Sequence, residues 1–300
     1  MINSINPSAD SFLVNIHRLQ EKAERAQQQI GSGLRIINAS DDPDEVGALV
    51  EAGSHVARNT QIARNLDRTK SEVDGAELAL STAITTLEKI SVLGTQGANF
   101  NQTAAARSQI ASEVTNLLGQ LVGNANTNVE RRYVFNGDTD QIAPYSIDLT
   151  TLTGTTPYAG TPSTRQVEDP RGGTFSISQT AQDIFDAPGG PSVFGAVNDL
   201  RVALLANDQD AIATAAGALQ GAHDHLSDSL AFYGSVQNQV ADATAATRVL
   251  GLRLTSALGD IRDADLVQAS SELVATRLQL DATFSARVLV PQRSLFDFLG

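Results

Sequence analysis

The chain has 300 residues and a formal net charge of −13, and only 5% of its residues are aromatic. The acidic balance argues against binding to nucleic acid or to an anionic membrane surface, because both require a basic patch. No cysteine occurs, which excludes disulfides, thiolate metal sites and thiol nucleophiles.

The first predicted helix carries a narrow apolar seam. Apolar residues recur at gaps of four and three, at Phe12, Ile16, Leu19, Ala23, Ala26 and Ile30. This spacing is typical of a coiled coil. The Gly31-Ser32-Gly33 segment predicts the end of that helix, because glycine tolerates positive φ. A second helix is predicted to begin at Asp42, whose carboxylate would cap the first turn, with Glu45 as the acid of a capping box.

The second predicted helix runs from Pro43 towards Leu93. At a rise of 1.5 Å per residue such a helix reaches roughly 75 Å, which is longer than a compact domain. The glycines and polar residues over 94–101 predict a break. Thr103 is then the expected cap of a third helix, with a seam formed by Ile110, Val114, Leu117 and Leu121.

The pattern changes after the third helix. Tyr133-Val134-Phe135 has the composition of a strand and is followed by the turn residues Asn136-Gly137. The segment 174–178 alternates polar and apolar residues, as a half-buried strand does. We therefore expect a small strand-and-loop domain between the helical arms.

Helical spacing returns near Phe194. Asn207-Asp208 is the expected cap of a long helix, whose apolar stripe includes Leu226 and Val240. A break is predicted at Gly259, and Asp263 is the expected cap of the last helix.

The predicted fold class is mainly α with a small β insertion. The N- and C-terminal arms would form a long antiparallel, coiled-coil-like rod, with a β-rich domain at its tip. This gives five segments: an N-terminal helix for assembly and export (1–42), the N-terminal half of the rod (43–133), the β-rich insertion (134–194), the C-terminal half of the rod (195–262) and a C-terminal assembly helix (263–300).

No catalytic constellation is found in the sequence. His223-Asp224-His225 is the one histidine cluster, but residues two apart on a helix do not face each other, so a solvated helix face is preferred to a metal site. Capping explains Asp42 better than a pair of catalytic acids does. The glycines at 31 and 33 lack the preceding strand and the spacing of a phosphate loop. We expect no enzyme activity, no cofactor and no metal.

Two stretches resemble one known family. The sequence IGSGLRIINASDDP, placed between two helices, is similar to the N-terminal segment of bacterial flagellins and their hook-associated relatives. The sequence LGDIRDADLVQASSELVATRLQLDATFSARVLVPQRSLFDFLG resembles the terminal helix of the same family. The step RYVFNG at 132–137, the middle segment and the SLFDFL ending resemble the members at the junction of hook and filament. The region LDATFSARVLV departs from the QQAGTSVLAQAN-like stretch of filament flagellins, although the first residues are closer to flagellin.

The resemblance implies a structural subunit of the flagellum at the hook-filament junction, exported by the flagellar type III apparatus and located outside the cell. It also implies partners: other copies of the chain, the neighbouring hook-associated protein, flagellin, and an export chaperone at the C-terminal helix. Neither nucleic acid nor a membrane is an expected partner. A filament flagellin is the alternative; a secreted effector carried on a flagellin-like rod and a cytoplasmic coiled-coil scaffold rank lower.

The two terminal helices are expected to order against other subunits, because an isolated helix of this length is marginal in water. The residues predicted to pack between subunits are Phe12, Ile16, Leu19, Ile30, Leu273, Leu280 and Phe284.

Overall fold

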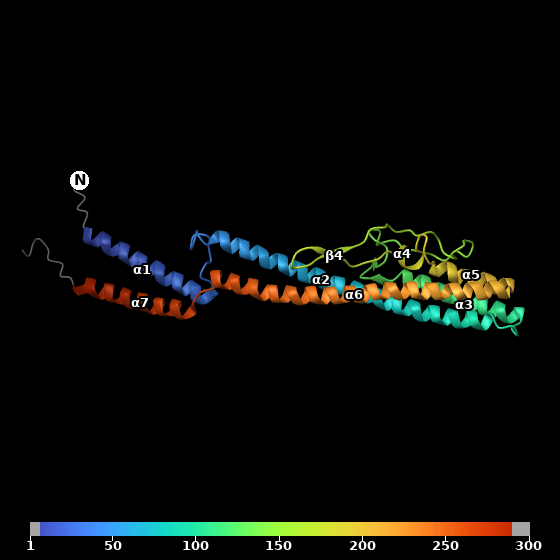
Figure 1. Cartoon of the computed structure of the whole chain (residues 1–300). Helices are drawn as coiled ribbons and strands as arrows, with labels where there is room; N and C mark the ends of the chain where they lie inside the picture. Colours follow the sequence, from blue (N-terminus) through green and yellow to red (C-terminus); the bar gives the residue numbers. More distant parts are fainter. Residues whose placement is uncertain (1–6, 290–300) are drawn as a thin grey trace, which may run out of the picture. The chain divides into compact units, whose positions relative to one another are not determined.

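The computed structural model describes residues 7–289, with side chains over 10–286, and the first residues and the SLFDFL ending lie outside this range. The chain divides into two compact units. Unit 1 combines Met1–Arg58 with Gly251–Gly300, and unit 2 is Asn59–Leu250. Helices α2 (Val46–Gly97) and α6 (Gln209–Arg262) contribute residues to both units (Figure 1).

Unit 1 is built on two helices that lie side by side, α1 (Pro7–Ser32) and α7 (Leu266–Leu289) (Figure 1). The predicted end of the first helix is confirmed, since α1 stops at Ser32 and Gly33 takes a φ of +73°, which favours glycine. Beyond this turn, Leu34 pairs with Asp263 as an isolated antiparallel bridge.

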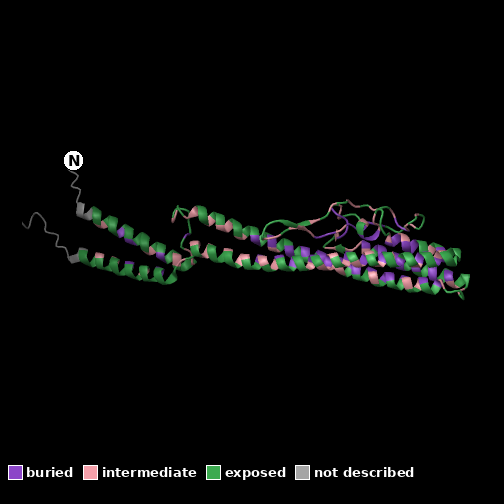
Figure 2. Cartoon of the chain, in the orientation of Figure 1, coloured by how far each residue is buried: buried purple, intermediate pink, exposed green. Residues whose placement is uncertain are grey.

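Unit 2 is organised by the antiparallel pairing of α2 with α6. The Asn59 side-chain amide donates to the Thr247 carbonyl oxygen at 3.1 Å, and the Gln237 amide donates to the Asp74 carboxylate at 3.1 Å. The expected packing of the two arms is confirmed by one core, which contains the fully buried side chains Leu80, Leu87, Leu226 and Val240. Figure 2 shows buried residues concentrated along these helices.

Helices α3 (Ala104–Ala125) and α5 (Val193–Ala206) pack against each other beside this pair. Two predicted caps are confirmed: the Thr103 hydroxyl accepts from the Ala106 amide, and the Asp208 carboxylate accepts from the Ala211 amide. Arg107 is 5% exposed and joins the two turns at this end, donating to the Gly97 carbonyl at 2.9 Å and to the side-chain oxygen of Asn207 at 2.7 Å.

The insertion contains two short antiparallel strand pairs and one short helix. Strand β1 pairs with β2 and β3 pairs with β4, and a helical turn follows. The bounds are Asn128–Val129 for β1, Arg132–Tyr133 for β2, Gln166–Glu168 for β3, Thr174–Ser176 for β4 and Ala181–Phe185 for α4. The predicted strand over 174–178 is confirmed for its first three residues. The first strand pair begins six residues before the expected boundary at 134.

The insertion shares its core with the helices of unit 2. Phe135 contacts Tyr233 of α6 edge to face at 5.9 Å between ring centroids, and Phe185 stacks on Phe194 of α5 at 5.3 Å. All four rings are fully buried. The fold class is therefore confirmed as mainly α with a small β insertion, but the insertion has no core separate from that of the helices. The sequence pattern predicted a separate domain because it reveals the strands of the insertion. It does not reveal that Phe135 and Phe185 pack against aromatic residues of the helices.

We predict that Phe185→Ala lowers the free energy of unfolding by about 3–5 kcal/mol, because it removes a buried ring from a packed core. Urea unfolding followed by circular dichroism measures this loss. Phe100→Ala is the matched control, because Phe100 is 83% exposed and its removal should change stability by less than about 0.5 kcal/mol. Equal effects of the two substitutions would show that the insertion does not belong to the cooperative core.

Candidate assembly surface

The seam predicted on the two terminal helices lies between α1 and α7 of the same chain. Ile16 and Leu19 of α1 are each 8% exposed, and Ala269 and Thr276 of α7 are buried as well. At the far end of the pair, Phe12 of α1 meets Phe284 of α7 edge to face, with 6.4 Å between ring centroids. The sequence therefore identified residues that pack in unit 1. Within one chain they pack against the other terminal helix, whereas the prediction placed them against other subunits.

The remaining predicted packing residues lie at the margin of this seam. Leu273 and Leu280 are half-buried on α7. Ile30 is 36% exposed and Phe284 is 50% exposed, so both retain apolar surface that another molecule can cover. Packing of the seven residues between subunits remains a prediction.

Helix α7 carries a second apolar stripe, which was not among the predicted packing residues. Val267, Val274 and Leu278 are 77%, 59% and 65% exposed. At 100° per residue they fall on one line, on the face of α7 opposite the buried Ala269 and Thr276. We call these three residues the outer stripe. Their spacing of seven and four residues is visible in the sequence. Only the position of the buried seam shows that this face of α7 points away from α1.

The segments that follow α1 and precede α7 form a hydrogen-bonded joint. The Arg35 amide donates to the Arg262 carbonyl at 2.7 Å, and the Ala264 amide donates to the Gly33 carbonyl at 2.9 Å. The Arg35 guanidinium donates to the Ile261 carbonyl in the last turn of α6 and to the Asp42 carboxylate, both at 2.7 Å. A cation is favourable at this end of a helix because the unpaired carbonyls there carry partial negative charge. Arg35 was not predicted as a site residue.

This joint explains why the predicted start of α2 was wrong. The helix begins at Val46, because the Asp42 carboxylate is held by Arg35 and residues 43–45 form a turn. Glu45 directly precedes the helix and its carbonyl accepts from the Leu49 amide at 2.9 Å, so it stands at the N-cap position and not at the third position of a capping box. The Asn38 and Ile37 amides donate to the Asp41 carboxylate and lower the pKa of Asp41.

The predicted cap of the last helix is displaced by two residues. The Asp265 carboxylate caps α7, because it accepts from the Val267 and Gln268 amides at 2.9 and 3.0 Å. Asp263 instead takes part in the backbone bridge to Leu34, and its carboxylate accepts from the Arg262 guanidinium. The predicted break at Gly259 occurs three residues later, since α6 extends to Arg262.

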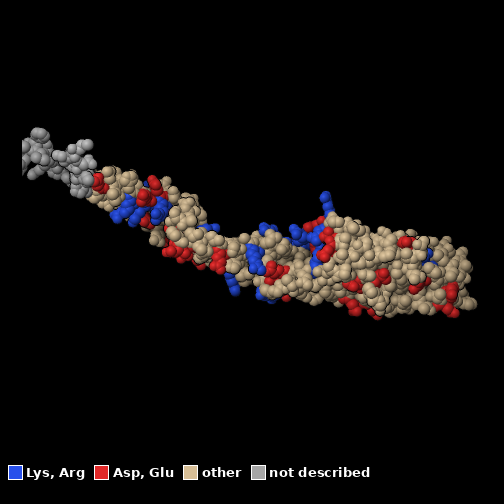
Figure 3. All heavy atoms as spheres, turned by 90° about the horizontal axis from the view of Figure 1, so that it is seen from above, with Lys and Arg blue, Asp and Glu red and all other residues tan. Residues whose placement is uncertain are grey.

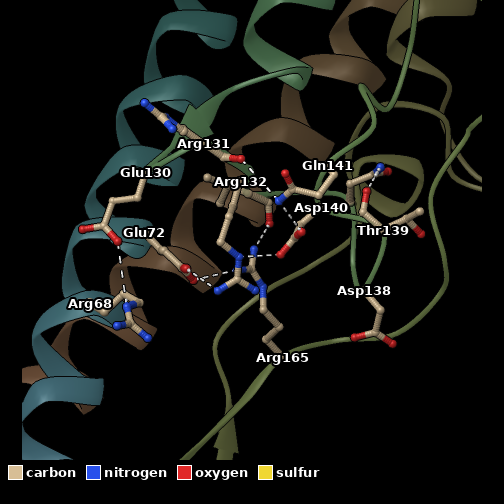
Figure 4. Close-up of polar contacts among 12 residues, drawn as sticks. Arg68, Glu72, Glu130, Arg131, Arg132, Asp138, Thr139, Asp140, Gln141 and Arg165 are labelled. Atoms are coloured by element: carbon tan, nitrogen blue, oxygen red, sulfur yellow. Dashed lines mark hydrogen bonds and ion pairs between the residues drawn. The ribbon is translucent and has the colours of Figure 1, made fainter.

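In unit 2 a buried ion network ties the insertion to α2 (Figure 4). Glu72 of α2 is 7% exposed and accepts from the Arg165 guanidinium at 2.8 Å. Arg165 also donates to the Val134 carbonyl at 2.7 Å. The Arg132 guanidinium lies 3.8 Å from the other oxygen of Glu72 and pairs with Asp140. This network is not predicted by the sequence pattern, because its members are separated by up to 93 positions in the chain.

The charges of this network stabilise each other. Hydrogen bonding by Gln141, together with the Arg132 guanidinium, lowers the pKa of Asp140. A carboxyl group whose pKa is lowered in the folded chain contributes stability above its ordinary pKa, and that contribution is lost as the pH falls through the lowered value. The arginines and carboxylates pair with one another, an arrangement that orients the insertion and resembles no acid-base pair for catalysis.

The two histidines of the 223–225 motif have different neighbours. His223 Nε2 lies 3.7 Å from the Glu88 carboxylate, whereas His225 Nε2 lies 2.8 Å from the Asp183 carbonyl. Within residues 7–289, the structure contains no group of three or more His, Asp or Glu side chains placed to hold a metal ion. None of the helices in this range is long and apolar enough to cross a membrane.

Comparison with known proteins gives consistent similarities. Residues 2–140 match the model of the bacterial flagellin N-terminal helical region. The chain is 26% identical to flagellar hook-associated protein 3 of Escherichia coli K12 over 295 residues, which cover 90% of each protein. It is 29% identical to a flagellin of Clostridium tyrobutyricum over 127 residues, which cover 42% of this chain and 34% of that flagellin.

Among solved structures, flagellar hook-associated protein 3 of Legionella pneumophila is similar in fold. The TM-score is 0.61 at 14% sequence identity, and the match covers 70% of this chain and 98% of the other. At that identity the likeness concerns the fold alone.

We predict that Glu72→Gln lowers the free energy of unfolding by about 3–5 kcal/mol, because it leaves the Arg165 guanidinium without its buried counter-charge. The measurement is urea unfolding at neutral pH. Glu113→Gln removes the same charge from an exposed position on α3 and serves as the control. A loss as small as that of the control would mean that the network does not hold the insertion.

Proposed function

Because this chain belongs to the bacterial flagellin family, we propose that it is a structural subunit of the flagellum at the junction between hook and filament. The observation that carries the proposal is the similarity to a hook-associated protein 3 along nearly the whole length of both chains. The similarity to a flagellin extends over less than half of this chain. A subunit of the filament itself is therefore the second candidate.

The subunit assembles with other copies of itself through its terminal helices. The geometry of α7 supports this, because the helix packs on α1 with one face and exposes the outer stripe on the opposite face. Burying a Val or Leu side chain contributes about 1.5–3 kcal/mol. In a tube the same contact repeats in every subunit, so these stabilising free energies add up along its length. The exposed parts of Ile30 and Phe284, at the margin of the seam between α1 and α7, offer further apolar surface to a neighbouring copy.

The proposal includes export by the flagellar type III apparatus and a location outside the cell. A chain without cysteine suits passage in an unfolded state, because it cannot become cross-linked by disulfides. Before export a chaperone covers α7, for which the apolar outer stripe is suited. After export the neighbours are the adjoining hook-associated protein and flagellin. The protein acts as a structural element and not as an enzyme.

The two candidates differ in what loss of the gene does. Without a junction protein, flagellin is still exported but is shed as free monomer, whereas without the filament subunit no flagellin is made. Counting attached filaments by electron microscopy and measuring flagellin in the medium of a deletion strain separates them. Normal filaments on that strain would exclude both.

We predict that Val274→Asp prevents stable attachment of filaments in the complemented deletion strain, because it places a charge in the outer stripe. The thermal midpoint of the purified monomer should be unchanged, since Val274 is 59% exposed. Gln279→Asp adds the same charge to an exposed position about 140° away around the helix and serves as the control. Full attachment with Val274→Asp, or loss of attachment with both variants, would contradict the assigned surface.

A further inference from the structure

The insertion exposes an unusual amount of apolar surface in one short loop. Ile147, Leu149 and Leu152 are 49%, 40% and 90% exposed. Three large apolar side chains this close together on a surface are typical of a contact site, because single exposed apolar residues are common but clusters are not. We call residues 147–152 the apolar loop.

The apolar loop is held rigidly in its exposed position. Ile147 pairs with Thr155 across the loop, and the Asp148 carboxylate accepts from the Thr150 amide at 3.0 Å. The Asn198 side-chain amide of α5 donates to the Leu152 carbonyl at 2.9 Å. Gly154 has a φ of +73°, and a methyl group there would lie 2.9 Å from Leu118. A loop ordered in advance loses little conformational freedom when it binds.

A groove that suits such a loop lies elsewhere on unit 2, between α2 and α6. Its volume is about 540 Å³, and its base is closed by Val73 and Val240, which are each only 1% exposed because they belong to the core. Ala241 and Ala245 form one wall and are exposed, and Val249 continues that wall by one further turn at 50% exposure. The rim carries two basic residues, Lys70 and Arg248.

The charges at the two places are complementary. Asp148 lies within the apolar loop, and its hydrogen bonds to Thr150 lower the pKa of its carboxyl group, so it is charged at neutral pH. Lys70 pairs with Asp74, whereas Arg248 forms no ion pair among the described residues. On the face shown in Figure 3, the end of unit 2 that holds α3 and α5 displays acidic side chains and few basic ones, and the basic residues gather away from that end.

The apolar loop and the groove of one chain cannot meet. The loop is anchored to Asn198 on α5, and the nearby Leu200 packs beside Gly94 of α2, where a methyl group would lie 3.2 Å from it. The groove is at Val73 of the same helix. The helix between Val73 and Gly94 spans roughly 30 Å at 1.5 Å per residue. Any occupant of the groove that resembles the loop must come from another molecule.

We propose that the apolar loop of one copy docks into the groove between α2 and α6 of a second copy. This inference rests on the proposed function, in which copies of the chain assemble. It adds a contact between copies that lies outside the terminal helices. Leu149 and Leu152 pack against the exposed Ala241 and Ala245 of the groove wall, and Asp148 faces Arg248. The contact joins two different surfaces, so it continues from copy to copy and suits a tube or ring better than a closed pair.

Cysteine cross-linking of the full chain tests the contact, because the natural sequence contains no cysteine to confuse the result. Leu152→Cys and Ala241→Cys are made as separate variants, mixed at high concentration and exposed to a mild oxidant. The mixture should give a disulfide-linked dimer that neither variant gives alone. Val92→Cys, at an exposed position on α2 outside both surfaces, replaces Ala241→Cys in the control mixture.

Each other outcome overturns the proposal. Dimers of Leu152→Cys alone would show a symmetric contact between loops. Equal yields with Ala241→Cys and Val92→Cys would show random collision, and no dimer in the mixture would show that the groove is not occupied by the loop. The proposed function fails separately, through normal filaments on the deletion strain. A failed cross-link beside a loss of attached filaments in that strain leaves the function standing and removes only this contact.

Discussion

The structure depends on burial of one continuous apolar stripe between two long helices. The buried side chains recur over the length of α2 and α6 in unit 2, and polar contacts at Asn59 and Asp74 fix the antiparallel register. A stripe this long is satisfied only by a partner of similar length, because a shorter element would leave apolar residues in water. Helices α3 and α5 and the insertion then pack on the core that this pair creates.

The insertion is attached by two kinds of interaction with different demands. Burial of the Phe135 and Phe185 rings is favourable and requires only a complementary apolar surface. The Glu72 carboxylate and the Arg165 guanidinium must be paired, since a buried charge without a counter-charge lowers the stability of the fold. The first interaction supplies most of the burial, and the second specifies where the strands lie along α2.

In unit 1 the apolar surface is only partly buried within the chain. Its helix α7 has apolar residues on two opposite faces, and α1 can cover only one of them. A helix with two apolar faces and a single partner keeps surface available for another molecule. In the proposed assembly the second face finds its partner in a neighbouring subunit. The same chain therefore combines a core that is complete in unit 2 with terminal helices whose outer surface is left open.

The sequence by itself determined the helices, their seams and the caps at Thr103 and Asp208, because these features depend on residues within a few positions of each other. Only the tertiary structure decided the starts of α2 and α7. Arg35 holds Asp42 while it also donates to the Ile261 carbonyl, 226 positions away in the chain. Leu34 pairs with the backbone of Asp263. Contacts between distant parts of the chain therefore accompany the displacement of both caps that local rules predict. The partners of Glu72, and the face of α7 that meets α1, were decided in the same way. Such pairings depend on which surfaces the folded chain brings together, and the spacing of residues along the sequence does not contain that information.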